Sequence, residues 1–459
     1  MLGTFLKPEC EELIRAKNWS ALREVFSELD GPDIAEIIED LPSEESALIF
    51  RLLPRDVAAD VFEYLPLEQQ TVLVQTLGSE QLANVLNEMA PDDRTRLLEE
   101  LPAEVTRRLL RSLSPEELKV ARQLLGYPED TAGRRMTPEY LAVRPDMTAS
   151  EALAYVRLHG KDRETLNVIF IVDERGHLLG DFRLASLVLA PPDAKVETLE
   201  DRQLISIPAN TNLEEVVQTF EKYDRVALPV TDTRGILVGI ITVDDVLDVA
   251  EERATEDIQR LGGMEALEAP YFDIGIFDMV RKRAGWLAIL FVAQTLTTSV
   301  MGYFETELAQ AVVLTLFIPL IISSGGNSGS QATSLIVRAM AVREIELRDW
   351  MRVLGREVVS GLALGAFLGV LGVLRVVFWP DAEAHYGEHF VRVGVTAGLS
   401  VLGVVLFGSV TGAMLPMLLR RLGLDPAAAS APFVATLVDV TGLVIYFSVA
   451  LLVLRGTLL

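Results

Sequence analysis

Residues 432–454 read PFVATLVDVTGLVIYFSVALLVL and contain one charged side chain, Asp439. About 20 apolar residues form a helix long enough to cross ~30 Å of hydrocarbon. A carboxylate within such a helix costs about 2.5–3.5 kcal/mol on the insertion scale and therefore indicates a function. The alternative is that Asp439 only bonds to a neighbouring helix. Because Thr436 lies one turn earlier and no His or Cys lies at membrane depth, we expect Asp439 to contact a hard cation.

Further apolar stretches precede this one, and the sequence predicts five spans, at residues 285–304, 308–337, 358–379, 393–419 and 427–454. The polar run at 323–331 falls inside the second span, and we expect it to interrupt that helix beside protein or water. Pro319, Pro416 and Pro432 predict helices that are broken or bent around a pathway.

Basic residues predict the orientation of these spans. They gather at 281–283, at 338–356 and at Arg420 and Arg421, and loops rich in Arg and Lys face the cytosol. Residues 1–10 lack a basic segment followed by an apolar run, so we expect no cleaved signal peptide and a cytosolic N-terminus. An odd number of spans places the C-terminus outside.

Charge is distributed unevenly along the 459 residues. The formal net charge is −25, but residues 285–459 hold 10 Lys and Arg against 11 Asp and Glu, so nearly all the excess acid lies before residue 285. An acidic head argues against nucleic acid as a partner. The single cysteine, Cys10, excludes a disulfide framework. No phosphate-binding Gly-Lys loop and no Ser/His/Asp grouping is present, so we do not expect an enzyme.

The first segment has a regular punctuation of about 12 residues. Leu41-Pro42, Leu53-Pro54, Leu65-Pro66, Leu77-Gly78, Ala90-Pro91, Leu101-Pro102 and Ser114-Pro115 mark it. Proline is tolerated at a helix start and carboxylates favour the first turn, so each unit is predicted to be one helix of about two to three turns. Such helices are stable only when stacked, which predicts a superhelix of short helices. Alone, this segment would also fit an interaction scaffold.

The second segment contains an internal repeat. Residues 144–153 resemble residues 207–216, and Asp173-Glu174-Arg175-Gly176 answers Asp232-Thr233-Arg234-Gly235, 59 residues later. Each copy reads as a turn, a capped helix, a strand, an Asp-x-x-Gly hairpin, a strand and a helix. The first copy has the longer helix–strand loop, around residues 159–162.

This repeat resembles a tandem pair of CBS modules, which implies a cleft that binds adenosyl ligands. Thr242 and Asp245 match the ribose-binding Thr-x-x-Asp of that family, whereas the first copy, at 180–186, lacks the Asp. ATP at the CBS pair and a purely structural or ion-sensing pair both remain open. Asp245, Asp248 and Glu252 share one helical face, which predicts either a solvated acidic face or a surface neutralised by cations.

The whole assembly resembles the MgtE family of bacterial magnesium transporters. The most specific pieces are Gly325-Gly326-Asn327-Ser328-Gly329-Ser330-Gln331 and the segments 424–426 and 435–442. The resemblance covers essentially the whole chain. It implies a multidomain fold: an all-α N-terminal superhelix of short helices at 1–130, a tandem α/β CBS pair at 131–250, a long connecting (plug) helix at 251–284, and a five-helix α transmembrane domain at 285–459.

The resemblance also implies a function and its residues. We expect a homodimeric, Mg²⁺-selective channel or transporter for Mg²⁺ uptake and magnesium homeostasis, in the lipid of the bacterial inner membrane. Mg²⁺ is expected as both the transported and the regulatory ion. The implied pore residues are Asp439 and the Ala435 carbonyl, with Asp425 at the cytosolic mouth. The implied sensor residues for cytosolic Mg²⁺ are Asp60 and Asp92 in the N domain, Glu214, Asp224, Asp245 and Asp248 in the CBS region, and Glu256 and Asp257 in the plug.

Some residues differ from the pattern of this family, and other functions are also considered. Arg96 replaces a carboxylate of the family in the turn after Asp92, and Ala431 replaces an Asn before Pro432. A broader divalent pathway for Co²⁺, Mn²⁺ or Ca²⁺ is the second hypothesis within transport, and a membrane-anchored Mg²⁺ sensor or scaffold is a third. His385 and His389 could capture a metal outside, but a solvated charged loop is favoured.

Overall fold

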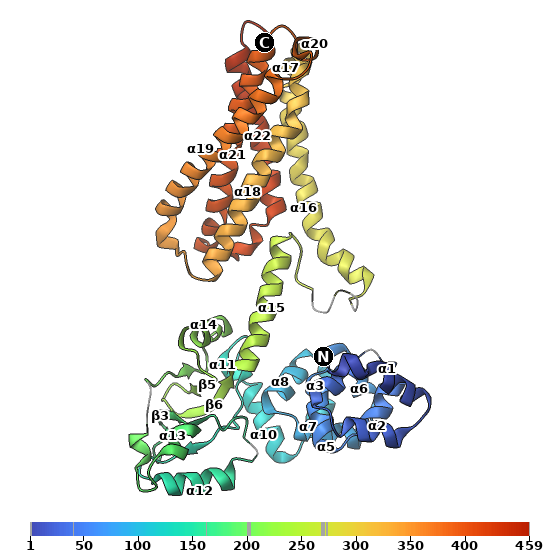
Figure 1. The fold of residues 1–459 in the computed structure, drawn as a ribbon, viewed down its shortest axis with the longest axis vertical. Coiled ribbons are helices and arrows are strands. Elements are labelled where there is room, and N and C mark those ends of the chain that lie inside the picture. The colour runs from blue at the N-terminus through green and yellow to red at the C-terminus, as the bar shows by residue number, and fades with distance from the viewer. Residues whose placement is uncertain are drawn as a thin grey trace. The chain divides into compact units, whose positions relative to one another are not determined.

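The computed structural model describes residues 2–39, 41–161, 163–199, 203–267, 271 and 274–458. The chain divides into two compact units, residues 1–251 and 252–459. Figure 1 shows the short helices and small sheets of the first unit and the long helices of the second. Each unit is described by itself below.

The N-terminal part of the first unit is built from short helices, as the punctuation predicts. They are α1 (Leu2–Arg15), α2 (Trp19–Phe26), α3 (Gly31–Ile38), α4 (Ser43–Phe50), α5 (Arg55–Glu63), α6 (Leu67–Thr76), α7 (Ser79–Glu88), α8 (Pro91–Glu100), α9 (Ala103–Leu110) and α10 (Pro115–Leu124). The prolines of the punctuation stand at the N-cap or in the first turn, where the missing N–H costs nothing. The helices share one apolar core, running from Cys10 to Ala121.

The repeat forms two small mixed sheets of the same order, as expected for a CBS pair. In the first copy, β1 (Ala142–Val143), β2 (Val168–Val172) and β3 (Leu178–Arg183) lie in the order β1-β2-β3, with α12 (Ala149–His159) and α13 (Leu184–Leu189). In the second copy, β4 (Ile207–Pro208), β5 (Ala227–Thr231) and β6 (Leu237–Thr242) repeat that order, with α14 (Leu213–Tyr223). A short helix α11 (Ala132–Arg135) precedes the first copy, and η1 (Val196–Thr198) links the two.

Local capping explains why both copies begin in the same way. Thr148 and Glu151 form a reciprocal capping box on α12, and the Asn212 side chain accepts a hydrogen bond from the Glu214 N–H on α14. Asp173 and Asp232 each accept backbone hydrogen bonds within their hairpin turns. In the predicted longer loop of the first copy, residue 162 lies outside the described residues.

The connecting helix differs from the predicted range of 251–284. Helix α15 runs from Val243 to Leu261, and Gly263 follows it with φ of 74°, a left-handed value that glycine adopts readily. The next helix, α16, begins only at Ile276. The predicted single helix is therefore two helices, separated by a glycine stop.

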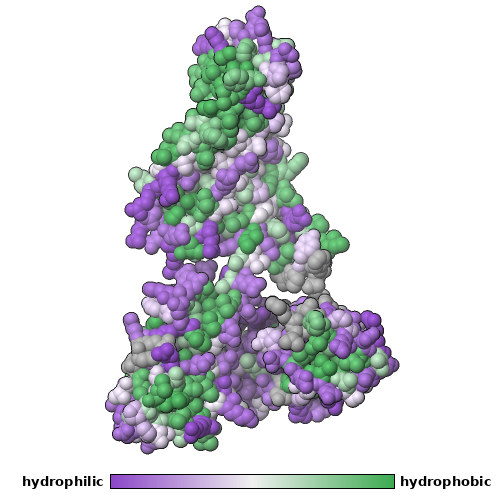
Figure 2. Space-filling view, viewed as in Figure 1, coloured by the Kyte–Doolittle hydropathy of each residue, from purple (hydrophilic) through white to green (hydrophobic). Residues whose placement is uncertain are grey.

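Five long apolar helices form the second unit, as the sequence predicts for the described residues. They are α16 (Ile276–Tyr303), α18 (Ile318–Ala341) with the preceding 3-10 turn η2 (Val312–Phe317), α19 (Trp350–Val377) after η3 (Leu347–Asp349), α21 (Phe390–Arg421) and α22 (Ala431–Leu454). Short helices α17 (Glu305–Gln310), α20 (Ala382–Tyr386) and η4 (Pro426–Ala428) connect them. Hydrophobic residues cover much of the visible face of this unit (Figure 2).

The predicted helix breaks are wrong. Helix α18 is continuous through the polar run at 323–331, and α21 is continuous through Pro416. A helix satisfies its own backbone in the membrane, so an unbroken one is the cheaper solution. Pro319 and Pro432 lie in first turns, where proline is tolerated.

Of the three prolines just named, Pro416 lies inside its helix, and a neighbouring helix compensates for it. Pro416 has no N–H to donate to the Gly412 carbonyl four residues earlier. The Thr333 hydroxyl of α18 donates to that carbonyl instead, at 3.0 Å. The prediction failed because it could not include this hydrogen bond from a second helix.

Candidate ion pathway and acidic cluster

Asp439 lies on α22, half-buried within the five-helix unit. The Gln294 side chain of α16 forms a hydrogen bond with its carboxylate. One turn earlier, the Thr436 hydroxyl donates to the Pro432 carbonyl at 2.9 Å, which satisfies the backbone group next to the helix start. Asp439 is thus oriented by a neighbouring helix. The sequence prediction did not identify Gln294, which carries no charge and belongs to no motif.

The two family-specific segments lie against each other. An added Cβ at Gly326 of α18 would lie 3.5 Å from the Ala435 Cβ of α22, and the Ser330 hydroxyl donates to the Ala431 carbonyl at 3.3 Å. Backbones approach this closely only where the side chains are small. The structure thus places the glycine-rich run of α18 along the same stretch of α22 that carries Ala435 and Asp439.

Polar side chains of α18 point out of the unit at membrane depth. Asn327 and Gln331 are exposed and lie one turn apart on α18. Polar groups within a span face protein or water rather than lipid. Asn327 and Gln331 are therefore candidates to face protein or water beside the predicted residues Ala435 and Asp439.

A second candidate site is an acidic cluster within the first unit. Asp92, in the first turn of α8, is 6% exposed, and its Oδ1 has no hydrogen-bond partner among the described atoms. Burial, followed by repulsion from Asp245, Asp93 and Glu164, raises the pKa of Asp92 well above its ordinary value. Burial and the surrounding carboxylates also raise the pKa of Asp245 and of Glu164 to about 7. A cation would relieve this repulsion.

Glu63 connects this cluster to a helix start. Its Oε1 accepts a hydrogen bond from the Ala90 N–H at 2.7 Å, at the N-cap of α8. Burial, with Asp93 as the next cause, raises the pKa of Glu63 to about 8 despite that bond. Glu63 and Glu164 belong to the cluster but were not predicted, because no sequence pattern links them to Asp92 and Asp245.

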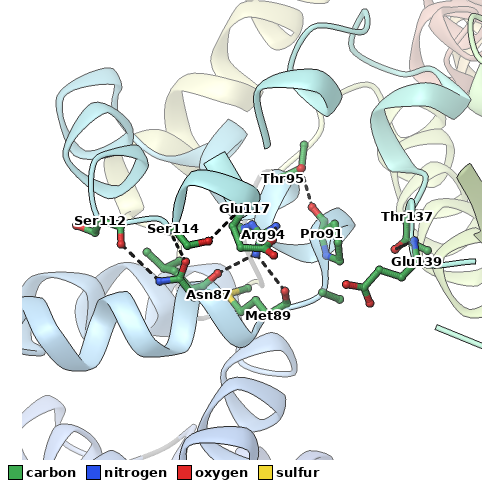
Figure 3. A network of polar contacts seen from close by, with 12 residues as sticks. Asn87, Met89, Pro91, Arg94, Thr95, Ser112, Ser114, Glu117, Thr137 and Glu139 are labelled. Atoms are coloured by element: carbon green, nitrogen blue, oxygen red, sulfur yellow. Dashed lines mark hydrogen bonds and ion pairs between the residues drawn. The ribbon is translucent and has the colours of Figure 1, made fainter. Parts of the chain in front are cut away.

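A buried arginine, two residues after Asp92, anchors α8. Arg94 is fully buried and donates to the Leu86 carbonyl at 3.0 Å and to the Met89 carbonyl at 3.3 Å, and it forms an ion pair with Glu117 (Figure 3). The Asn87 side chain accepts from the Ser114 N–H at 2.7 Å and joins α7 to the start of α10 (Figure 3). These contacts fix the turn that presents Asp92.

Arg96 forms an ion pair within the first unit. Its guanidinium pairs with Asp248 of α15 at 3.1 Å. The departure noted in the sequence therefore replaces a carboxylate with a resident positive charge, and that charge engages one of the predicted sensor residues. Because the pair is exposed, it contributes at most about 1 kcal/mol.

Other predicted residues lie apart from the cluster or do different work. The Asp60 carboxylate accepts a hydrogen bond from the Gly31 N–H at the start of α3, and burial raises its pKa. Glu214 and Asp224 are exposed at opposite ends of α14, where Asp224 forms the left-handed C-cap with φ of 48°. The structure does not bring Glu214 and Asp224 to Asp92.

Two of the predicted acidic residues of the second unit form ion pairs with an arginine. Arg260 near the end of α15 pairs with Asp425 and, at 3.5 Å, with Glu256. The hydrogen bond that Arg260 donates to Asp425 is the main cause that raises the pKa of Arg260, with Asp257 contributing last. Asp425 also accepts from the Ala427 N–H at 2.8 Å. The end of α15 is thereby tied to the connection between α21 and α22.

Packing strengthens that connection. An added Cβ at Gly263 would lie 2.8 Å from the Trp286 ring and 3.3 Å from Pro432. The Trp286 Nε1 donates to the Ser430 hydroxyl at 3.0 Å, at the N-cap of α22. The segment after α15, Trp286 of α16 and the start of α22 therefore pack against one another.

The second-copy Thr-x-x-Asp is engaged with the acidic cluster. The Thr242 hydroxyl donates to Asp245 Oδ2 at 2.9 Å. In the first copy, Asp181 forms a buried pair with Arg225 at 3.4 Å. Asp181 is therefore committed to an ion pair.

The described residues do not form a ready-made chelating site. Among them, no group of three or more His, Cys, Asp or Glu side chains lies close enough to hold a metal ion. Mg²⁺ keeps several waters and needs only one or two carboxylates. Asp92 Oδ1 has no partner among the described atoms and neighbouring carboxylates repel Asp92, so added positive charge would stabilise its ionised form. His385, predicted to lie in an external loop, is exposed and lies near Asp381 and Trp379.

Comparisons with known proteins agree with this arrangement. The profile of the MgtE divalent cation transporters matches residues 318–449, that of the MgtE intracellular N domain matches 29–130, and that of the CBS domain matches 196–252. Solved structures similar to the chain include the cytosolic domain of the Mg²⁺ channel MgtE in complex with ATP (37% identity, TM-score 0.51, 53% of this chain and 100% of that one). Another is the soluble part of a magnesium transporter (26% identity, TM-score 0.52, 55% and 99%).

Full-length relatives match across both units. The magnesium transporter MgtE of Thermus thermophilus is 43% identical over 333 residues, which is 72% of each chain. The magnesium transporter MgtE of Enterococcus faecalis is 32% identical over 340 residues, which is 74% of this chain and 73% of that one. With this identity, these profiles and five membrane-length helices, the chain is a membrane protein that belongs to the MgtE family of divalent cation transporters.

Proposed function

We propose that this protein carries Mg²⁺ across the membrane and that cytosolic Mg²⁺ closes the pathway. The observation that carries the proposal is the position of Asp439 on α22, the helix that packs against the glycine-rich run of α18. Gln294 of α16 orients the Asp439 carboxylate by a hydrogen bond. The 43% identical relative is named a magnesium transporter. Oxygen ligands without described His or Cys partners favour a hard cation. In the proposed mechanism, Asp439 attracts the hydrated ion, and the Ala435 carbonyl one turn away accepts a hydrogen bond from its water shell.

We further propose that the acidic cluster senses cytosolic Mg²⁺. Asp92, Asp245 and Asp248 would be its main residues, with Glu256, Asp257 and Asp425 acting through α15. Asp60, which repels Glu63 and accepts a hydrogen bond from the Gly31 N–H, and the exposed Glu214 and Asp224 complete the proposed set. Bound Mg²⁺ supplies positive charge that neutralises the carboxylates, and its loss leaves them repelling one another.

Assembly and nucleotide binding are separate proposals. A homodimer in a bacterial inner membrane, with its N-terminus in the cytosol, would allow two Asp439 side chains to face one pathway. ATP at the CBS pair is supported by the similar cytosolic domain that was crystallised with ATP. Titration calorimetry of the full chain with ATP tests this, and the absence of binding heat would exclude it.

The transport proposal is tested with vesicles that contain the full chain and a Mg²⁺-sensitive dye. We expect Asp439→Asn to abolish Mg²⁺ uptake, because the intramembrane charge is lost. The control, Glu383→Gln in the α20 connection, removes the same charge elsewhere and is expected to keep normal uptake. Normal flux through Asp439→Asn would refute the pore assignment. Equal uptake of Mg²⁺, Co²⁺ and Mn²⁺ would favour the broader divalent pathway.

A further inference from the structure

A recess in the second unit belongs neither to the ion path nor to the acidic cluster. It lies between the start of α19 and the second half of α21 and has a volume of about 690 Å³. Ligand pockets typically enclose about 300–1,000 Å³. Figure 1 shows α19 and α21 running side by side, and they pack extensively against each other.

The recess has an apolar wall and a cationic rim. Trp350, Met414, Leu415 and Leu418 contribute to the wall, and Arg348 and Arg421 both line the same recess. Trp350 and Leu418 are half-exposed, at 50% and 51%. A tryptophan at the start of a membrane helix is typical of the interface between headgroups and hydrocarbon.

The two arginines differ in their protein contacts. Arg348 pairs with Glu346 at 3.0 Å, and its side chain remains 79% exposed. Arg421, in the last turn of α21, has no hydrogen bond or ion pair with any described residue. A guanidinium with no partner among the described residues, beside an apolar slot, matches a ligand with one anionic end and one apolar end.

We propose that this recess binds an anionic phospholipid, with its phosphate between Arg348 and Arg421 and an acyl chain along the apolar wall. Basic pockets between membrane helices bind anionic headgroups, and guanidinium groups match phosphate geometry. Because the two arginines are positively charged, the recess favours an anionic lipid over a zwitterionic one. The inference depends on the five spans and on no property of the transported ion.

The test is native mass spectrometry of the full chain in detergent, titrated with phosphatidylglycerol or phosphatidylcholine. We expect phosphatidylglycerol to bind the wild type more tightly than phosphatidylcholine. The double variant Arg348→Gln/Arg421→Gln is expected to lose about 10- to 30-fold in phosphatidylglycerol affinity, with phosphatidylcholine binding unchanged. Leu415→Trp places a larger side chain in the recess and keeps both arginines. This variant is expected to weaken phosphatidylglycerol binding as well.

A matched control removes two arginines from the same basic end of the unit. Arg338→Gln/Arg343→Gln changes the net charge equally at two residues that do not line the recess, and we expect it to keep phosphatidylglycerol affinity within about twofold. Three outcomes would overturn the proposal: no preference for phosphatidylglycerol, unchanged affinity in Arg348→Gln/Arg421→Gln, or an equal loss in the control. Disulfide-linked dimers of Leu415→Cys in a Cys10→Ser background would instead assign the recess to a contact between two copies.

Discussion

Two arginines two positions apart on α8 show how burial decides what a charge does. Arg94 is fully buried, bonded to two carbonyls and paired with Glu117. Arg96 is exposed and pairs with Asp248 of α15. The first is structural, since a buried ionic group that loses its partner is costly. The second adjusts the charge of the acidic cluster.

Arg94→Met is therefore expected to destabilise the helices around α8 by about 3–5 kcal/mol, because Glu117 and two carbonyls lose a buried partner. Hydrogen exchange of α7, α8 and α10 in the full chain measures this. Arg96→Met is the matched control and is expected to change exchange by less than about 1 kcal/mol. Similar exchange in both variants would contradict the structural role of Arg94.

Glu63 gives a pH dependence with a defined sign. Its pKa rises from 4.5 to about 8 in the folded protein, so the folded state binds a proton that the unfolded state has released. The stability contributed by this group is present below the unfolded pKa and is lost as the pH rises towards about 8. Without divalent cations, the first unit is expected to melt at a lower temperature at about pH 8 than at about pH 5.

The measurement is a thermal melt of the full chain in chelator across that pH range. Glu63→Gln should flatten the pH dependence, since the amide keeps an acceptor for the Ala90 N–H and cannot ionise. Added Mg²⁺ should restore stability at the alkaline end by neutralising the remaining carboxylates. A melting temperature that rises between about pH 5 and 8 in chelator would contradict the charged cluster.

At the scale of elements, glycines determine how α18 and α21 fit together. An added Cβ at Gly412 would lie 2.2 Å from the Gly329 carbonyl oxygen, and one at Gly408 would lie 2.4 Å from the Gly325 oxygen. The glycine-rich run therefore provides close backbone contact between helices, and the sequence prediction interpreted it as a break. Thr333 then reaches across this contact to the carbonyl freed by Pro416.

Gly412→Ala is expected to destabilise the membrane unit by about 1–3 kcal/mol, because α18 and α21 must separate. Gly372→Ala in α19 is the control, since an added Cβ there meets no atom within 4 Å. Thermal unfolding in detergent compares the two. A melting temperature for Gly412→Ala equal to that of the control would show that the close approach of α18 and α21 is not required.

The elements also show what a single sequence can predict. The length of the apolar stretches predicted the five spans, and the regular spacing of prolines predicted the short helices, because both patterns are local in the sequence. Asp439 and the α15 carboxylates could be predicted because charge is conspicuous in their context. Gln294, Glu63 and Glu164 could not, since their roles depend on contacts between distant segments. The continuity of α18 and α21 was missed for the same reason.

At the scale of the molecule, α15 is the element that connects sensing to conduction in the proposed mechanism. It begins beside the acids of the cluster, at Asp244 and Asp245, and Arg260 in its last turn is tied to Asp425. Gly263, Trp286 and Pro432 pack together immediately after it. In the proposed mechanism, a change in the charge of the cluster would be transmitted along α15 to these contacts at the start of α22.

The most direct test of the account is the current through inside-out patches that contain the protein, as bath Mg²⁺ is stepped from zero to millimolar. We expect a Mg²⁺ current at low bath Mg²⁺ that closes as bath Mg²⁺ rises. Asp245→Asn/Asp248→Asn/Asp257→Asn is expected to stay open at the high concentration. Closure of this variant at the wild-type concentration would place the sensor elsewhere, and Mg²⁺ uptake without any current would contradict a self-gated channel.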